Sequence, residues 1–355
     1  MMKYLLFVCL LCVGCTARQP EKKKQEMKLL PIWRFKPGFL TRTLAMKYGY
    51  LYGYSSYTRH GFYFKISMKD GSIQWKVEAG NNISAPPGFS GEFTYVFDTY
   101  NGLQMIDSYG KITWQEDVEG YEHITPVGWK EKVFLNSAKH GLACFDTRSR
   151  TMSWKMAPSE NTWEWPMAPA LAGDILFTGV GNRLLAVDLT KNSVKWQLEY
   201  PESQFSSVSV SDTNLYAGVY NIYDIENSFI AVIDARTGTL RWKQQCNYDR
   251  KVSPVLLKDV ICFYSSHEVV CLDARDGGEK WKTELMSYGV VKQFVRVGSF
   301  IGFCNEGDEV CLVDAEDGGV VFRQSFESEA PVLLTSHDEI FIATNRGAIY
   351  KIVKK

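Results

Sequence analysis

Short apolar runs separated by turn-forming residues follow one another along most of the chain. In one such unit, the run Val260–Tyr264 is followed by a polar turn and by a second run, Val269–Asp273. Runs of this length, rich in β-branched and aromatic residues and bounded by turns, predict β-hairpins rather than amphipathic helices. A proline opens the first run of most units, which suits a strand with an unpaired edge. These prolines are Pro86, Pro126, Pro169, Pro254 and Pro331.

An aromatic residue marks the end of each unit. The intervals between these residues are 39 to 46 residues, and the series is Trp33, Trp75, Trp114, Trp154, Trp196, Trp242, Trp281 and Phe322. A repeat of this length matches one four-stranded blade of a β-propeller. We therefore expect the indoles to lie on one face of the last strand of each blade, packed between neighbouring blades.

The turn before each aromatic residue also repeats. Five of the eight units have an aspartate eight residues before the aromatic residue, namely Asp146, Asp188, Asp234, Asp273 and Asp314. Such an aspartate can accept hydrogen bonds from turn amides, and a glycine four residues later, as at Gly238, supplies a positive φ. The repeat departs from this pattern at Asp107, which is one residue closer to Trp114, and at Ser67, which replaces the aspartate. Asn192 and Arg150 replace the glycine.

The two ends of the chain complete one unit together. Pro31–Phe35 resembles only the last strand of a unit, whereas Pro331–Val353 resembles the first three strands. Pairing them would close the circle and leave no seam in the ring. The sequence thus predicts an all-β fold, a closed eight-bladed β-propeller whose N-terminal strand completes the last blade. A seven-bladed ring would require discarding either the Phe322 unit or residues 39–75.

The N-terminus has the pattern of an export signal. Tyr4–Val13 is apolar but too short to span a bilayer, and Gly14-Cys15 resembles the bacterial lipobox. By that resemblance Cys15 is lipidated, and Thr16 favours sorting to the outer membrane; an ordinary cleaved signal is the alternative. The predicted organisation is a signal peptide over 1–14, a lipidated flexible tether over 15–30 and the propeller over 31–355.

Charge and cysteine content narrow the function classes. Forty basic residues balance forty acidic ones in the 355-residue chain, which argues against a nucleic-acid partner. The five histidines have no metal-ligand spacing, and no Cys-x-x-Cys motif occurs after Cys15, the last cysteine of the predicted signal and lipobox. Cys262 and Cys271, like Cys304 and Cys311, lie on the two arms of a predicted hairpin. Each pair can form a disulfide or remain as buried thiols, and the sequence leaves both open.

The recurring Asp-Ala-x-x-Gly-x-x-x-Trp turns, as in Asp234–Trp242, resemble the repeat of the pyrroloquinoline-quinone-like propellers. A compact eight-bladed lipoprotein with this repeat is similar to the BamB family of outer-membrane β-barrel assembly. That resemblance implies a periplasmic protein, anchored by lipid to the outer membrane, which binds the barrel-forming subunit and uses no cofactor. It implies partner contacts at Leu198 and at Asp249 and Arg250, although Glu199 and Lys251 depart from the family pattern in charge.

Two tryptophans give a second candidate for partner binding. Trp163 and Trp165 lie in the linker before a predicted inner strand, where exposed aromatic side chains would suit a protein interface. Burial within the protein is the other interpretation.

Catalysis finds little support. A quinoprotein dehydrogenase uses a similar repeat, but the chain lacks the adjacent cysteine pair of those enzymes, and its repeated aspartates are explained by their turns. We therefore predict a non-catalytic binding scaffold with no catalytic, cofactor or metal site. The alternatives are a propeller that serves another envelope partner or binds a small ligand in its channel, and a quinoprotein dehydrogenase.

Overall fold

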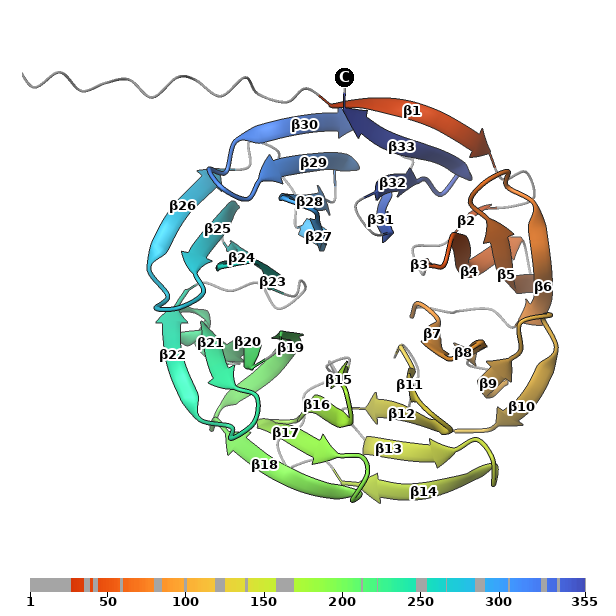
Figure 1. The fold of residues 1–355 in the computed structure, drawn as a ribbon, viewed down its shortest axis with the longest axis horizontal. Coiled ribbons are helices and arrows are strands. Elements are labelled where there is room, and N and C mark those ends of the chain that lie inside the picture. Colours follow the sequence, from red (N-terminus) through yellow and green to blue (C-terminus); the bar gives the residue numbers. More distant parts are fainter. Residues whose placement is uncertain are drawn as a thin grey trace, which may run out of the picture.

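Eight antiparallel sheets form a closed ring in the computed structural model (Figure 1), which confirms the predicted eight-bladed propeller. The structure describes residues 27–34, 39–40, 44–57, 60–79, 85–98, 101–118, 125–137, 140–157, 169–211, 213–221, 223–246, 254–265, 267–284, 291–305, 307–326, 331–336 and 339–354. Within these ranges, no helix is long and apolar enough to cross a membrane.

Blades are numbered here in chain order. Blades 1 to 4 contain β2 (Phe39–Leu40), β3 (Ala45–Lys47), β4 (Tyr50–Tyr57), β5 (His60–Ser67) and β6 (Ile73–Ala79); β7 (Gly88–Ser90), β8 (Phe93–Asp98), β9 (Gly102–Ile106) and β10 (Ile112–Glu116); β11 (Val127–Trp129), β12 (Lys132–Ser137), β13 (Gly141–Asp146) and β14 (Thr151–Met156); and β15 (Ala170–Ala172), β16 (Ile175–Val180), β17 (Arg183–Asp188) and β18 (Ser193–Glu199). In blade 1, β2 and β3 both pair with β4.

Blades 5 to 8 contain β19 (Ser203–Ser211), β20 (Asn214–Asn221), β21 (Phe229–Asp234) and β22 (Leu240–Gln245); β23 (Val255–Leu257), β24 (Val260–Ser265), β25 (Glu268–Asp273) and β26 (Glu279–Glu284); β27 (Val291–Val297), β28 (Phe300–Asn305), β29 (Glu309–Asp314) and β30 (Val320–Ser325); and β31 (Val332–Ser336), β32 (Glu339–Ala343), β33 (Ala348–Lys354) and β1 (Met27–Arg34). A short 3-10 helix, η1 (Ile225–Asn227), lies between β20 and β21.

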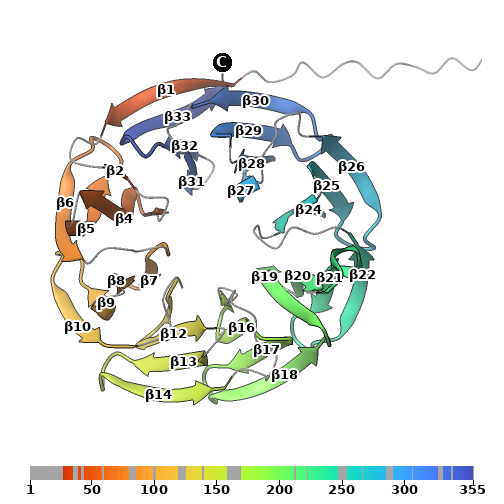
Figure 2. The same ribbon diagram turned by 180° about the vertical axis from the view of Figure 1, so that it is seen from behind.

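The ring closes in blade 8, where the N-terminal β1 lies along the C-terminal β33 in both views (Figures 1 and 2). The register runs from Met27 opposite Lys354 to Arg34 opposite Ala348. The strand therefore begins four residues before the boundary predicted at residue 31. Met27 and Leu29 pack against the cluster between blades 7 and 8. Their alternation with polar residues was not recognised in the sequence, because this part of the chain follows the charged residues of the expected tether.

The hydrophobic core lies between the blades rather than within any one of them. Between blades 6 and 7, for example, Tyr264 and Val269 contribute to the same buried cluster as Ile301 and Phe303. Each blade buries one face of its sheet against the blade before it and the other against the blade after it. Stability is thus shared among junctions of nearest neighbours around the ring.

A β-bulge shifts the register between the third and fourth strands of every blade, immediately before the aromatic position. In blade 4, Ala186 pairs with Trp196 while the next residue, Val187, pairs with Val194. Because one residue is skipped, Val194 and Trp196 lie on opposite faces of the sheet. Val194 is exposed, whereas Trp196 turns toward blade 5.

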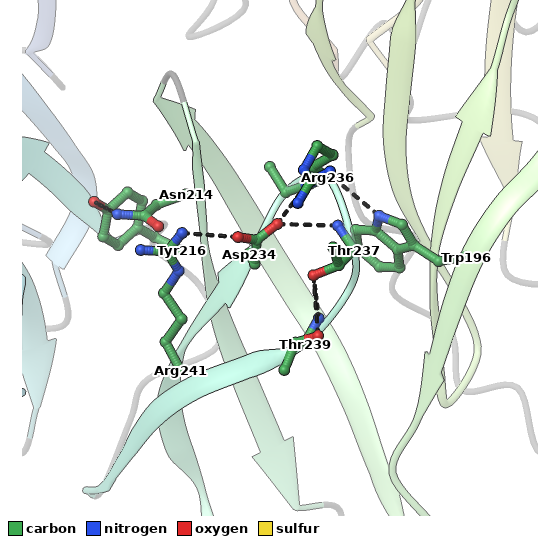
Figure 3. A network of polar contacts seen from close by, with 9 residues as sticks. Trp196, Asn214, Tyr216, Asp234, Arg236, Thr237, Thr239 and Arg241 are labelled. Carbon is green, nitrogen blue, oxygen red and sulfur yellow. Dashed lines mark hydrogen bonds and ion pairs between the residues drawn. The ribbon is translucent and has the colours of Figure 1, made fainter.

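The aromatic residue fastens its blade to the turn of the next blade. Trp196 Nε1 donates to Ala235 O at 3.0 Å (Figure 3). A Cβ on Gly238 would lie 2.7 Å from the indole, so this position has room only for glycine. Asp234 Oδ1 accepts the turn amides of Arg236 and Thr237, each at 3.0 Å, as the sequence predicted for the repeated aspartates. Trp33, Trp242 and Trp281 donate likewise to Met68, Ala274 and Ala315.

Three consecutive junctions lack this hydrogen bond. The indole nitrogens of Trp75, Trp114 and Trp154 are buried without a hydrogen-bond partner in the part of the chain that the structure describes. The turns after Trp114 and Trp154 have Arg150 and Asn192 in place of the glycine, with φ of 60° and 51°. In these two turns a side chain therefore stands where the turn beside Trp196 has Gly238. The turn that faces Trp75 is tighter, because Gly110 N bonds to Asp107 O three residues back.

The two cysteine pairs differ in register. Cys262 lies directly opposite Cys271, and the two form a disulfide. Cys304 lies opposite Val310, and Cys311 opposite Phe303, so their side chains emerge on opposite faces of blade 7. Both are buried and neither forms a disulfide, and burial raises the pKa of Cys311 to about 12.

Acid is expected to weaken the turns through their aspartates. The Arg241 guanidinium, assisted by the turn amides, lowers the pKa of Asp234 to about 2. Since the folded pKa lies below the unfolded value of about 3.9, Asp234 contributes stability above about pH 4 and loses it as the pH falls toward 2. Asp234→Asn should therefore lower the urea midpoint at neutral pH. The difference in midpoint between this variant and the unaltered chain should shrink as the pH falls from about 4 toward 2. Asp259→Asn, whose side chain accepts no hydrogen bond within the described ranges, is the matched control and should show no such shrinking difference.

Candidate partner-binding site

The linker from blade 4 to blade 5 is held in place by an aromatic cluster. The Tyr200 ring lies 5.8 Å from Phe205 and 5.2 Å from Phe229, centroid to centroid. Tyr200 N donates to Asn182 O at 3.1 Å, and Glu202 takes a φ of 58° in the turn that leads into β19. This packing raises the pKa of Tyr200 by burial of its hydroxyl. The linker is thus a fixed surface feature.

Leu198 does not project from this linker. It lies opposite Leu184 at the end of β18 and packs, half-buried, against the hydrophobic cluster between blades 4 and 5. Leu198 thus lies at the base of the linker, and its part in partner binding remains a prediction. The alternation of β18 sends Leu198 inward and exposes Glu199.

The remaining site predictions fall on other parts of the chain. Cys15, Trp163, Trp165, Asp249 and Arg250 lie outside the described residues. They remain predictions.

A second loop, between β20 and β21, lies beside the linker. Asn221 pairs with Ser203, the first residue after the linker turn. Asn221 Oδ1 accepts the amides of Tyr223 and Asp224, each at 2.9 Å, and Gln245 Nε2 donates to Glu226 O at 2.7 Å. Tyr223 is held outward by this network with 73% of its surface exposed.

Linker and loop together form what we call the linker–loop site: Glu199, Glu202, Tyr223, Asp224 and Glu226. All five side chains are exposed. None of the four carboxylates forms an ion pair within the described ranges; Glu199 accepts from Asn182 Nδ2 at 2.9 Å, and Asp224 from Asn227 Nδ2 at 2.8 Å. The site is therefore a negatively charged surface around one projecting aromatic ring. Sequence reasoning missed Tyr223, although the Asn and Asp residues around it are typical of a structured turn.

Cofactor and metal binding have few possible sites. Among the described residues, no group of three or more His, Cys, Asp or Glu side chains could hold a metal ion. A hollow of about 470 Å³ opens into the channel, lined by the inner strands of blades 5 to 8; Ser211, Phe294, Arg296 and Thr335 are among its lining residues. Arg296 is its single charged side chain.

A match to a protein-family model shows which family the chain belongs to. The model described as outer membrane protein assembly factor BamB matches residues 65–283 and 266–355. The chain belongs to this family. The BamB-type repeat predicted from the tryptophan-centred turns is thereby confirmed.

Solved structures show the same fold at low sequence identity. BamB from Moraxella catarrhalis is similar with a TM-score of 0.75 at 16% identity, covering 92% of this chain and 99% of that chain. The computationally designed protein Ika8 has a TM-score of 0.71 at 12% identity, covering 92% and 99%. A europium-containing methanol dehydrogenase has a TM-score of 0.60 at 13% identity, covering 89% and 84%. No curated protein matches the chain in sequence.

Proposed function

We propose that the chain is a non-catalytic scaffold of outer-membrane protein assembly, held at the periplasmic face of the outer membrane by a lipid on Cys15. Membership of the BamB family supports this role. The linker–loop site carries the proposal at the level of residues, because it presents a fixed and accessible contact surface. Asp249, Arg250, Trp163 and Trp165 would extend the contact.

The chemistry of the linker–loop site favours a basic partner surface. An exposed tyrosine at the centre of a patch is a common anchor, and unpaired carboxylates around it steer a partner of opposite charge. Glu199 stands where the BamB family pattern has arginine. The barrel-forming partner of this chain would therefore carry lysine or arginine opposite Glu199.

Affinity capture of the lipidated chain from solubilised envelopes tests the role. The barrel-forming subunit should be recovered with the unaltered chain, and Tyr223→Ala or Glu199→Lys should reduce its recovery about tenfold, as expected for loss of an anchor or reversal of a charge. Tyr109→Ala is the matched control, because Tyr109 is 88% exposed on a turn of blade 2. It should leave recovery unchanged.

The outcomes of that capture are distinct. Recovery of a different envelope complex would overturn the assembly role while leaving the propeller fold intact. Equal loss in Tyr109→Ala and Tyr223→Ala would place the contact elsewhere. Cys15→Ala should release the chain from the membrane fraction without weakening capture of a soluble fragment of the partner.

The channel hollow supports a second candidate function, the binding of a small anion. Among the described residues, Arg296 bonds only to Leu256 O, at 3.5 Å from its Nη1, so its charge is available to a ligand. Ser211 and Thr335 add hydroxyl groups. Calorimetry with small carboxylates should then show binding that Arg296→Gln removes; heat unchanged by this substitution would reject the candidate.

A further inference from the structure

A surface hollow lies beside the outermost strand of blade 2. It has a volume of about 470 Å³ and is lined by the five consecutive residues Ile112–Glu116 of β10 and by Arg150 from the turn of blade 3. Strand β10 pairs only with β9, so its other edge presents unpaired backbone groups. The hollow thus follows a free strand edge for its full length.

Strand β10 lacks the positively charged side chain that every other outer strand has. Lysine or arginine occurs in each of the remaining seven, β1, β6, β14, β18, β22, β26 and β30, but β10 reads Ile-Thr-Trp-Gln-Glu. Positive side chains on an edge strand hinder pairing with another chain. The edge of β10 is therefore the one that the sequence leaves open to pairing.

Arg150 supplies a positive charge from the neighbouring blade instead. It is exposed and forms no ion pair with any described residue, in contrast to Arg148 of the same turn, which pairs with Glu131. Its φ of 60° places a side chain where the repeat has glycine. Trp114, which lines the same hollow, is 5% exposed, and its indole nitrogen is buried without a hydrogen-bond partner among the described residues. An arginine held in a backbone conformation that favours glycine, with no ion pair to any described residue, points to a binding role.

We propose that the β10 edge binds an extended peptide segment by strand addition, with an acidic side chain of that segment paired to Arg150. Backbone hydrogen bonds along Ile112–Glu116 supply affinity, and Arg150 supplies selectivity for the acidic residue. This site is separate from the linker–loop site on blades 4 and 5, and it does not depend on which complex the chain serves.

Hydrogen–deuterium exchange with a synthetic peptide tests the proposal. The probe has about ten residues, to match a strand length, alternates Thr and Val, and has blocked ends and one central Glu. It should slow exchange of the β10 amides and leave those of β14 unchanged. A peptide with Lys in place of Glu should bind about tenfold more weakly, as expected for loss of one charge-assisted pair.

Variants separate the charge from the edge. Arg150→Asn keeps a residue that tolerates positive φ and should bring the Glu peptide down to the affinity of the Lys peptide. Arg148→Asn, in the same turn, is the matched control and should leave binding unchanged. Gln115→Lys places a cation on β10 and should abolish protection by either peptide. Protection of a different outer strand, or equal affinity of Arg150→Asn and the unaltered chain for the Glu peptide, would overturn the proposal.

Discussion

A chain that lacks Met27–Arg34 is expected to lose the closed ring and to associate through the uncovered edge of β33. Met27–Arg34 forms β1, the outermost strand of blade 8. From this strand, Trp33 Nε1 donates to Met68 O of blade 1 at 3.1 Å. Met27, Leu29, Ile32 and Trp33 are half-buried against their neighbours. At about 1 to 1.5 kcal/mol for each half-buried side chain, the loss is roughly 5 kcal/mol.

Urea unfolding and size-exclusion chromatography measure this effect. A chain that begins at Met27 is the control, and it should be as stable as the full chain and monomeric. A peptide spanning Met27–Arg34, added to the shortened chain, should restore stability and dissolve the oligomers, because it refills the same edge. Unchanged stability of the shortened chain would show that the ring does not depend on β1.

The repeat made the fold predictable because the same residue pattern connects each blade to the next one. Asp234 binds the turn amides, Gly238 allows the close approach of Trp196, and the indole reaches the next blade. The bulge that rotates each indole was not predictable, since it skips a residue without a characteristic residue type. The departure at Arg150 was visible in the sequence because it breaks the repeat. That Arg150 and Trp114 line one hollow could be seen only in the structure.

Register explains most of what sequence reasoning missed. Both cysteine pairs lie on hairpin arms, but only Cys262 and Cys271 are opposite each other. The alternation of β18 packs Leu198, half-buried, against the cluster between blades 4 and 5 and exposes Glu199; a partner contact at Leu198 stays a prediction. Tyr223 belongs to a loop whose outward geometry depends on Asn221 and Gln245, which are distant from each other in sequence.

Replacing Gly277 with valine is expected to destabilise the propeller by about 2 to 5 kcal/mol. Gly277 has a φ of 80°, which costs a β-branched residue roughly 1 to 2 kcal/mol. Its Cβ would also lie 2.9 Å from the Trp242 ring, and such overpacking costs roughly 1 to 3 kcal/mol. Movement of the indole would further break its bond to Ala274 O. Chemical denaturation of the purified variant measures the change.

Gly49→Val separates the two contributions, because Gly49 has a φ of 77° but no atom within 4 Å of its Cβ position. It should show the backbone strain alone, about 1 to 2 kcal/mol. In the background of Trp242→Ala, Gly277→Val should fall to the same cost, since the ring that it strikes is gone. If Gly277→Val were equally destabilising in the Trp242→Ala background, glycine would be needed at this position only for the backbone conformation of the turn. Glycine lies against a tryptophan ring at five of the eight junctions, and this repeated pairing would then need another cause than contact between blades.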